Sequence, residues 1–239
     1  MASSNAKAEL DFDYFWFEER FRGDEAVIKE RQRIYVDYFR AKNNALDLGC
    51  GRGEFLELLR ENGISARGVD INTDMVLLCR EKGLDVVQED LFTYLESIPD
   101  ESLDGIFAAQ VIEHLDSSKI LTLVRLLHRV LTEDGVCVVE TVNPQCLTTF
   151  SGAFYADLTH VKPIHPLALQ FIFESMNFHH CDIAFTTPHD ETERLIPLPV
   201  SEIASTPSER AKLEDFNQRS LRLNDLLFSW KEYAVIARK

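Results

Sequence analysis

The stretch Leu46-Asp47-Leu48-Gly49-Cys50-Gly51-Arg52-Gly53 decides the fold. The apolar residues from Ala45 to Leu48 predict a buried strand. The glycines that follow allow a tight turn and bring a ligand close to bare backbone. An apolar face from Phe55 to Leu59 then predicts a helix that ends at Asn62-Gly63. This stretch therefore predicts a strand, a ligand-binding loop and a helix in immediate succession.

The same alternation of short apolar runs and helical segments continues to about Glu140. It is typical of an α/β fold with a doubly wound, Rossmann-like, mostly parallel sheet. The further strands are expected at Ala66 to Asp70, Asp85 to Gln88, Leu103 to Ala109, Val136 to Thr141, Cys181 to Thr186 and Glu232 to Arg238. The further helices of this region are expected at Met75 to Lys82, Ser117 to Leu131 and Pro166 to Met176.

Two segments depart from this pattern. Residues 1–43 combine a dense aromatic stretch with an expected helix from Asp24 to Arg40, and we expect them to form an N-terminal helical cap. Residues 44–239 would form the main domain, with an insertion at about 187–230. Within the insertion, Ser208 to Trp230 is a mostly polar helix, which we interpret as a cap or an association surface, for example of a homodimer.

Composition limits the partners and the compartment. A net charge of -15 argues against nucleic acid as the main partner. We find neither a signal peptide nor an apolar run of the roughly 20 residues that span a bilayer, and so expect a cytoplasmic protein. The five cysteines include no Cys-x-x-Cys pair, so they predict neither a disulfide framework nor a zinc site.

The glycine loop favours a nucleoside ligand without a bound phosphate. Glu54 occupies the third glycine position of the dinucleotide fingerprint, where an acid would face the pyrophosphate. Asp70 ends the second strand, where doubly wound sheets present a carboxylate to a ribose diol. Ile71 offers an apolar surface to one face of an adenine, and Asp90 could accept a hydrogen bond from its exocyclic amine. A nicotinamide-dependent oxidoreductase is the weaker alternative.

These residues resemble the class I S-adenosylmethionine (SAM)-dependent methyltransferases over roughly Asn44 to Asn143. The matching segments are the loop stretch, Gly68-Val69-Asp70, Gln88-Glu89-Asp90-Leu91 and Val111-Ile112-Glu113-His114-Leu115. The resemblance implies a seven-stranded sheet with an antiparallel last strand, and SAM as the cofactor. It places the ribose on Asp70, the adenine edge on Asp90, and the sulfonium beside Gln110 and Val111. The implied cofactor set also contains Asp47, Gly49, Gly51, Gly53, Ile71 and Leu91.

A narrower resemblance concerns the acceptor. Residues 17–23 and 154–166 are similar to bacterial methyltransferases associated with cell-surface polysaccharide, including O-antigen synthesis. In that group the N-terminal helix folds over the cofactor, which makes Tyr14, Phe15 and Arg31 candidate contacts to its methionine end. The acceptor would then be a sugar hydroxyl or a phosphate of a surface glycan, or an unrelated small molecule.

His160, Asp157 and His114 are the candidate catalytic residues, because they follow the fifth and fourth strands on the ligand-binding side. A hydroxyl acceptor would need a general base such as His160, whereas an anionic acceptor would need a cation such as Lys162. Structural roles are the alternatives: His160 and His165 could organise a turn, and His114 could begin a helix. A metal site built from Asp157, His160 and His165 is the weaker alternative, because methyl transfer does not require an ion, so no metal site is expected. A non-catalytic assembly partner that keeps the cofactor pocket also remains open.

Overall fold

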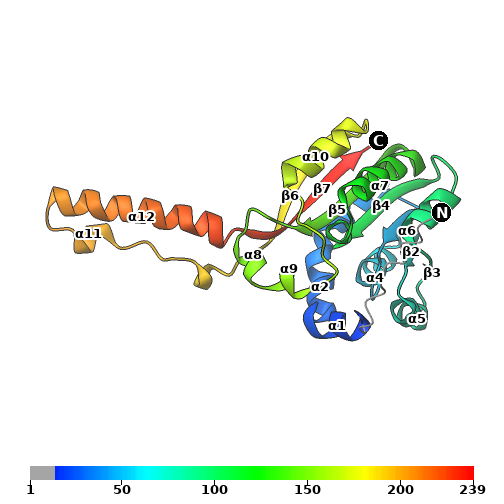
Figure 1. Ribbon diagram of the computed structural model, residues 1–239, viewed down its shortest axis with the longest axis horizontal. Helices are drawn as coiled ribbons and strands as arrows, with labels where there is room; N and C mark the ends of the chain where they lie inside the picture. Colours follow the sequence, from blue (N-terminus) through cyan, green and yellow to red (C-terminus); the bar gives the residue numbers. More distant parts are fainter. Residues whose placement is uncertain (1–13) are drawn as a thin grey trace, which may run out of the picture.

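A seven-stranded sheet forms the centre of the molecule, as seen in the computed structural model, which describes residues 14–239 apart from the side chains at 14, 15, 18, 19 and 153 (Figure 1). The strand order is β3-β2-β1-β4-β5-β7-β6. The first five strands pair in parallel, and β7 is antiparallel to both β5 and β6. The strands are β1 (Ala45–Leu48), β2 (Ala66–Asp70), β3 (Val86–Gln88), β4 (Leu103–Ala109), β5 (Leu131–Val142), β6 (His179–Pro188) and β7 (Trp230–Arg238). The expected fold class is confirmed.

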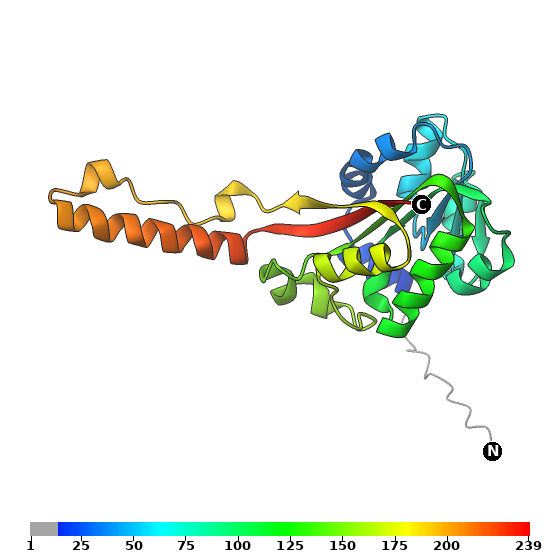
Figure 2. The ribbon, with the colours of Figure 1, turned by 90° about the horizontal axis from the view of Figure 1, so that it is seen from above.

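Helices cover both faces of this sheet (Figures 1 and 2). The α-helices are α1 (Tyr14–Phe21), α2 (Glu25–Gln32), α3 (Val36–Phe39), α4 (Glu54–Glu61), α5 (Thr73–Glu81), α6 (Leu91–Ser97), α7 (Ser117–Val130), α8 (Thr148–Ser151), α9 (Ala153–Ala156), α10 (Pro166–Ser175), α11 (Val200–Ile203) and α12 (Pro207–Leu227). The 3-10 turns are η1 (Arg33–Tyr35), η2 (Ile112–His114) and η3 (Glu191–Glu193). Across residues 14–239, no helix is both long enough and apolar enough to cross a bilayer.

Alternating side chains of the central strands divide the core between the two faces. On β4, Ile106 packs into the cluster that α7 and α10 cover, whereas its neighbour Phe107 packs into the opposite cluster with Tyr35 and Phe55. This alternation is the normal consequence of strand geometry. Because both faces are buried, the strands can be short and almost wholly apolar. The sheet is thereby fixed as a rigid support for the loops at its ends.

Several expected boundaries need correction. The helix expected from Asp24 to Arg40 consists of α2, the turn η1 and α3. Strand β5 begins at Leu131 rather than at Val136, because Leu131 pairs with Leu103 of β4. The pairing register then shifts, and this shift accommodates the Asp134-Gly135 turn within the strand. The short helix α6 was not expected. It begins directly after Asp90, whose carboxylate caps its first backbone N–H groups.

The segment between β6 and β7 leaves the sheet as a long arm (Figures 1 and 2). Its main element is α12, which begins with a capping box at Thr206 and Glu209. The returning chain is tied to this helix by asparagines. Asn224 both donates to Leu195 O (2.9 Å) and accepts from Leu195 N (2.7 Å), and Asn217 makes the same two bonds with Leu198. Side-chain amides, rather than an apolar core, hold the arm together.

Candidate functional site

A cavity of about 940 Å³ opens at the carboxyl ends of the parallel strands. Each strand contributes to its wall at or just after its end, as expected for a doubly wound sheet. This wall includes Gly49 and Gly51 after β1, Asp70 and Ile71 at β2, Asp90 and Leu91 after β3, Gln110 and Val111 after β4, and Glu140 and Val142 on β5. The volume lies at the upper end of the range for ligand pockets, so it can hold a nucleoside cofactor and an acceptor together.

The glycine loop after β1 presents bare backbone to this cavity. Gly49 and Gly51 have positive φ angles of 68° and 51°. A Cβ atom on Gly49 would lie 2.7 Å from Val111 Cγ2, and one on Gly51 would lie 2.4 Å from Arg22 Nη1. Any side chain at either position would therefore disturb the wall on which the cofactor is expected.

Asp70 fixes the loop from the neighbouring strand. Its Oδ2 accepts a hydrogen bond from Gly51 N (2.9 Å), and its Oδ1 accepts one from Asn72 N (2.8 Å). Beside it, the side chain of Ile71 is 70% exposed at the cavity wall. The carboxylate and the apolar surface thus lie next to each other, in the arrangement predicted for a ribose and an adenine face. Asp90 also lines the cavity, but its Oδ1 is occupied in capping α6.

Two residues of the expected cofactor set lie behind the wall rather than in it. Gly53 turns toward the packing of α4 on α5, where an added Cβ would lie 2.5 Å from Leu84 Cδ1. Asp47 is only 3% exposed and does not line the cavity. Its burial raises its pKa well above the usual range, and the nearby Glu54 raises it further. We therefore assign Asp47 to supporting the loop.

The loop is also joined to the N-terminal helices. Arg52 and Glu54 form a buried ion pair of 2.9 Å, and Arg52 Nη2 donates to Gly23 O (3.1 Å). Next to this contact, the N-terminal segment forms part of the cavity wall through Phe17, Phe21, Arg22, Gly23, Ile28, Arg31 and Gln32. Arg31 therefore lines the cavity, while the side chains of Tyr14 and Phe15 lie outside the described part of the structure.

Elsewhere in the cavity wall, a short hydrogen-bond chain orients His114. Its Nδ1 lies 2.7 Å from Thr159 Oγ1, which in turn lies 2.6 Å from Asp157 Oδ1. A hydroxyl has a single hydrogen, and a carboxylate can only accept. Thr159 therefore donates to Asp157 and accepts from Nδ1–H of His114. This chain makes Nε2 the proton-accepting atom of the His114 ring.

The ring of His160 is also held through its Nδ1 atom. Its Nδ1 lies 2.6 Å from the carbonyl oxygen of Phe154, so Nδ1 carries the proton. Its ring packs against Phe154 and His114, with centroid distances of 4.6 Å in both cases. Asp157 Oδ2 lies 3.8 Å from its Nε2. The structure thus brings together His114, Asp157 and His160, the three residues that the sequence marked as catalytic candidates.

Two other candidates point elsewhere. His165 caps α10 by accepting from Leu167 N (3.3 Å), and the Lys162 ammonium donates to Ser117 Oγ (2.5 Å). Neither residue lines the cavity. A grouping of Asp157, His160 and His165 around one ion, which was considered from the sequence, is therefore not formed.

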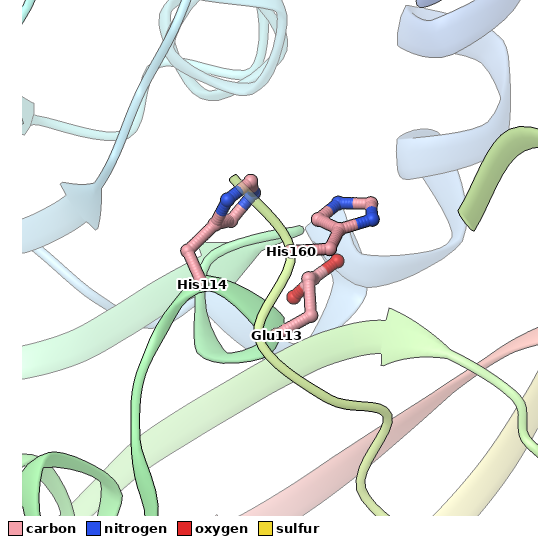
Figure 3. A group of neighbouring side chains, drawn as sticks. All are labelled: Glu113, His114 and His160. Atoms are coloured by element: carbon pink, nitrogen blue, oxygen red, sulfur yellow. The ribbon is translucent and has the colours of Figure 1, made fainter. Parts of the chain in front are cut away.

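Buried carboxyl groups surround this end of the cavity, and the sequence did not single them out. Glu113 is fully buried behind the wall, where burial raises its pKa to about 7. Glu140 lines the cavity and accepts a hydrogen bond from the Tyr35 hydroxyl. Burial, with the neighbouring charge of Glu232, raises the pKa of Glu140 to about 8. We call the group of Glu113, His114 and His160 (Figure 3), together with Thr159 and Asp157 behind His114, the transfer-end cluster.

Comparison with known proteins places this site in a family. A family model described as a methyltransferase domain matches residues 17–181. The crystal structure of a SAM dependent methyltransferase from Archaeoglobus fulgidus is similar, with 38% sequence identity and a TM-score of 0.88, covering 95% of this chain and 100% of that one.

Two curated relatives match shorter stretches. A ubiquinone biosynthesis O-methyltransferase from Actinobacillus pleuropneumoniae is 26% identical over 169 residues, which are 63% of this chain and 71% of the relative. A trans-aconitate 2-methyltransferase from Rhizobium rhizogenes is 39% identical over 77 residues, which are 30% of this chain and 29% of the relative.

Proposed function

The chain belongs to the family of SAM-dependent methyltransferases, and from this premise we propose that it transfers the methyl group to a hydroxyl oxygen of a small polar acceptor. The family confirms the first resemblance found in the sequence and removes the oxidoreductase alternative. The single observation that supports a hydroxyl acceptor is the Asp157-Thr159-His114 hydrogen-bond chain in the wall of the cavity.

The described residues fit the cofactor. The backbone at Gly49 and Gly51 would receive its methionine part, and Arg31 is suited to its carboxylate. Asp70 would accept from the ribose, with Ile71 and Leu91 beside the adenine. Gln110 and Val111 also line the cavity, directly before the turn η2 that carries Glu113 and His114. The cofactor supplies a methyl group on a sulfonium, so the chain itself mainly aligns the acceptor and excludes water.

The chemistry of the cluster favours a hydroxyl acceptor over an anionic one. A hydroxyl must lose its proton during transfer, whereas a phosphate or carboxylate already carries the charge and needs a cation. Lys162, the cation expected for an anionic acceptor, bonds to Ser117 instead. At the transfer end the wall carries imidazole rings and the carboxyl groups of Asp157 and Glu140. An imidazole can accept the proton of a hydroxyl, and the Asp157 carboxylate would repel an anionic acceptor.

The name of the Actinobacillus relative, an O-methyltransferase, agrees with transfer to oxygen, whereas the Rhizobium relative is named for trans-aconitate, a carboxylate. A sugar hydroxyl of a surface glycan remains one member of the proposed acceptor class. It rests on the narrower sequence resemblance alone, since the relatives named above are not polysaccharide enzymes by name.

A panel of hydroxyl, phosphate and carboxylate compounds, incubated with labelled SAM, tests the proposal. We expect label in base-stable methyl ethers, and a large loss of turnover in His114→Ala with little change in S-adenosylhomocysteine affinity. His165→Ala is the matched control, because His165 lies outside the cavity. Methyl esters as the only product, or unchanged turnover of His114→Ala, would contradict the proposal. No transfer to any compound, together with tight cofactor binding, would favour the non-catalytic alternative.

We also propose that the arm pairs two copies of the chain. Phe216, Leu221, Leu223 and Leu226 of α12 are each about half exposed, which is unusual for four large apolar side chains on one helix. Sedimentation should show a dimer that Phe216→Ser with Leu223→Ser converts to a monomer, while Lys212→Ser does not. A wild-type monomer at every concentration would rule out this pairing.

A further inference from the structure

The transfer-end cluster has the composition of a metal site. One potential ligand atom from each of Glu113, His114 and His160 lies within 4.8 Å of the other two. Figure 3 shows the Glu113 carboxylate below the two imidazole rings, which come from different segments of the chain. Two imidazoles and one carboxylate form a common ligand set for divalent transition metals, with further positions left for a substrate oxygen.

The partners behind the two rings match those of metal-bound histidines. Such histidines usually donate the second ring N–H to a carboxylate, a backbone carbonyl or another polar group, which fixes the tautomer. Here Nδ1–H of His114 is held by Thr159 and, through it, by Asp157. Nδ1–H of His160 is held by the Phe154 carbonyl. Both rings therefore offer Nε2 as the coordinating atom.

Glu113 provides an independent observation. Its side chain is completely buried, and Oε2 accepts a hydrogen bond from Thr141 Oγ1 (2.9 Å). Within residues 14–239, its Oε1 has no hydrogen-bond partner. A buried carboxylate oxygen without a donor is strongly unfavourable in a folded protein. A cation at the centre of the cluster would compensate this oxygen.

The chain fixes the cluster through its backbone. Val161 N donates to Glu113 O (2.8 Å), so the segment that carries Thr159 and His160 is joined to the turn η2 that carries Glu113 and His114. The two ring-bearing segments are therefore positioned by main-chain contacts that do not require an ion. Such preorganisation is expected of a binding site rather than of an accidental grouping.

We propose that Glu113, His114 and His160 bind one divalent transition-metal ion, which receives the acceptor oxygen at the transfer end of the cavity. This inference rests on the proposed function and refines it, because it assigns the activation of the hydroxyl to a Lewis acid and makes His114 a ligand of the ion rather than the proton acceptor. The acceptor O–H bond breaks and its proton passes to solvent, the oxygen forms a bond to the methyl carbon, and the carbon–sulfur bond breaks with its electron pair on sulfur. Two imidazole ligands favour Zn²⁺, Co²⁺ or Fe²⁺ over Mg²⁺.

Cobalt binding tests the proposal directly. Full-length protein is stripped with a chelator and titrated with Co²⁺, and binding is followed by calorimetry and by the visible absorbance of the ion. We expect one equivalent to bind, with affinity falling at least about 100-fold in Glu113→Gln and in His160→Ala. Thr159→Val should weaken binding by about 10- to 100-fold, because it removes the partner that orients His114. His179→Ala, which changes an exposed histidine on β6, is the matched control.

S-adenosylhomocysteine binding, measured in each variant, shows that the variant is folded. Binding of less than one equivalent of Co²⁺ to the wild type, or unchanged affinity in both Glu113→Gln and His160→Ala, would overturn the proposal. Full methyl transfer to a hydroxyl acceptor in excess chelator would overturn the proposed metal site and leave the proposed function intact. One bound equivalent without hydroxyl transfer would support the metal site and refute the proposed acceptor.

Discussion

Replacing Glu113 by Gln should change how the stability of the metal-free protein depends on pH. Burial raises the pKa of Glu113 from 4.5 to about 7. Below pH 4.5 the carboxyl group is protonated in both the folded and the unfolded chain, so its ionisation has no effect. As the pH rises from about 4.5 to about 7, Glu113 ionises first in the unfolded chain. The folded state therefore loses stability until the carboxyl group is ionised in both states above pH 7.

The size of the effect follows from the shift. At about 1.4 kcal/mol per pKa unit, ionisation of Glu113 destabilises the folded state by roughly 1 kcal/mol at pH 5 and roughly 3 kcal/mol at pH 8. Glutamine keeps the shape and cannot ionise. The free energy of unfolding of Glu113→Gln, relative to that of the wild type, should therefore rise by about 2 kcal/mol between pH 5 and pH 8.

Urea unfolding of both chelator-treated proteins at several pH values measures this difference. Glu140 is present in both proteins, so its own ionisation largely cancels in the comparison. A difference that stays constant from pH 5 to pH 8 would refute the placement of an ionisable Glu113 in the interior. With Co²⁺ bound, the wild type should instead gain stability with rising pH, since the ion requires the ionised carboxylate.

Three further substitutions test two residues of the cavity wall and one residue that supports the wall from behind. Gly49→Ala should weaken S-adenosylhomocysteine binding at least about tenfold in calorimetry, since its Cβ would lie 2.7 Å from Val111 Cγ2. Asp70→Asn should weaken it about 10- to 100-fold, as expected when charge-assisted hydrogen bonds are lost, and unchanged binding would refute the ribose assignment. Tyr35→Phe should lower the free energy of unfolding by about 1 to 3 kcal/mol in urea. It should also raise the pKa of Glu140, because the Tyr35 hydroxyl stabilises the ionised form.

Periodicity predicted the sheet because its strands are buried on both faces and lie close together in sequence. The strands Ala45–Leu48, Ala66–Asp70 and Leu103–Ala109 were predicted with the bounds that the structure shows. Errors arose where tertiary contacts override local pattern. Pairing of Leu131 with Leu103 extends β5 through a segment that resembles a turn, and helix α6 is too short to show a periodic apolar face.

The cofactor half of the cavity was largely predictable, because its residues stand immediately after successive strands. Parallel strands bring those positions to one edge of the sheet without any further information. Gly53 and Asp47 were expected in the cofactor set but do not line the cavity, for a different reason. A loop has two sides, and sequence spacing does not show that Gly53 faces Leu84 and that Asp47 lies behind the turn.

The acceptor half depends on contacts that no local pattern shows. Glu113 appeared in sequence as part of a helix start, and its role emerges only because Val161 N bonds to its carbonyl oxygen and brings His160 above its carboxylate. The same fold places Thr159 between His114 and Asp157. Sequence alone gives no reason to single out Thr159. In the structure it links the Asp157 carboxylate to the His114 ring and so fixes the orientation of the ring. We therefore assign to a cluster the chemistry that sequence assigned to single histidines, and an ion bound within that cluster would explain why its carboxylate is buried.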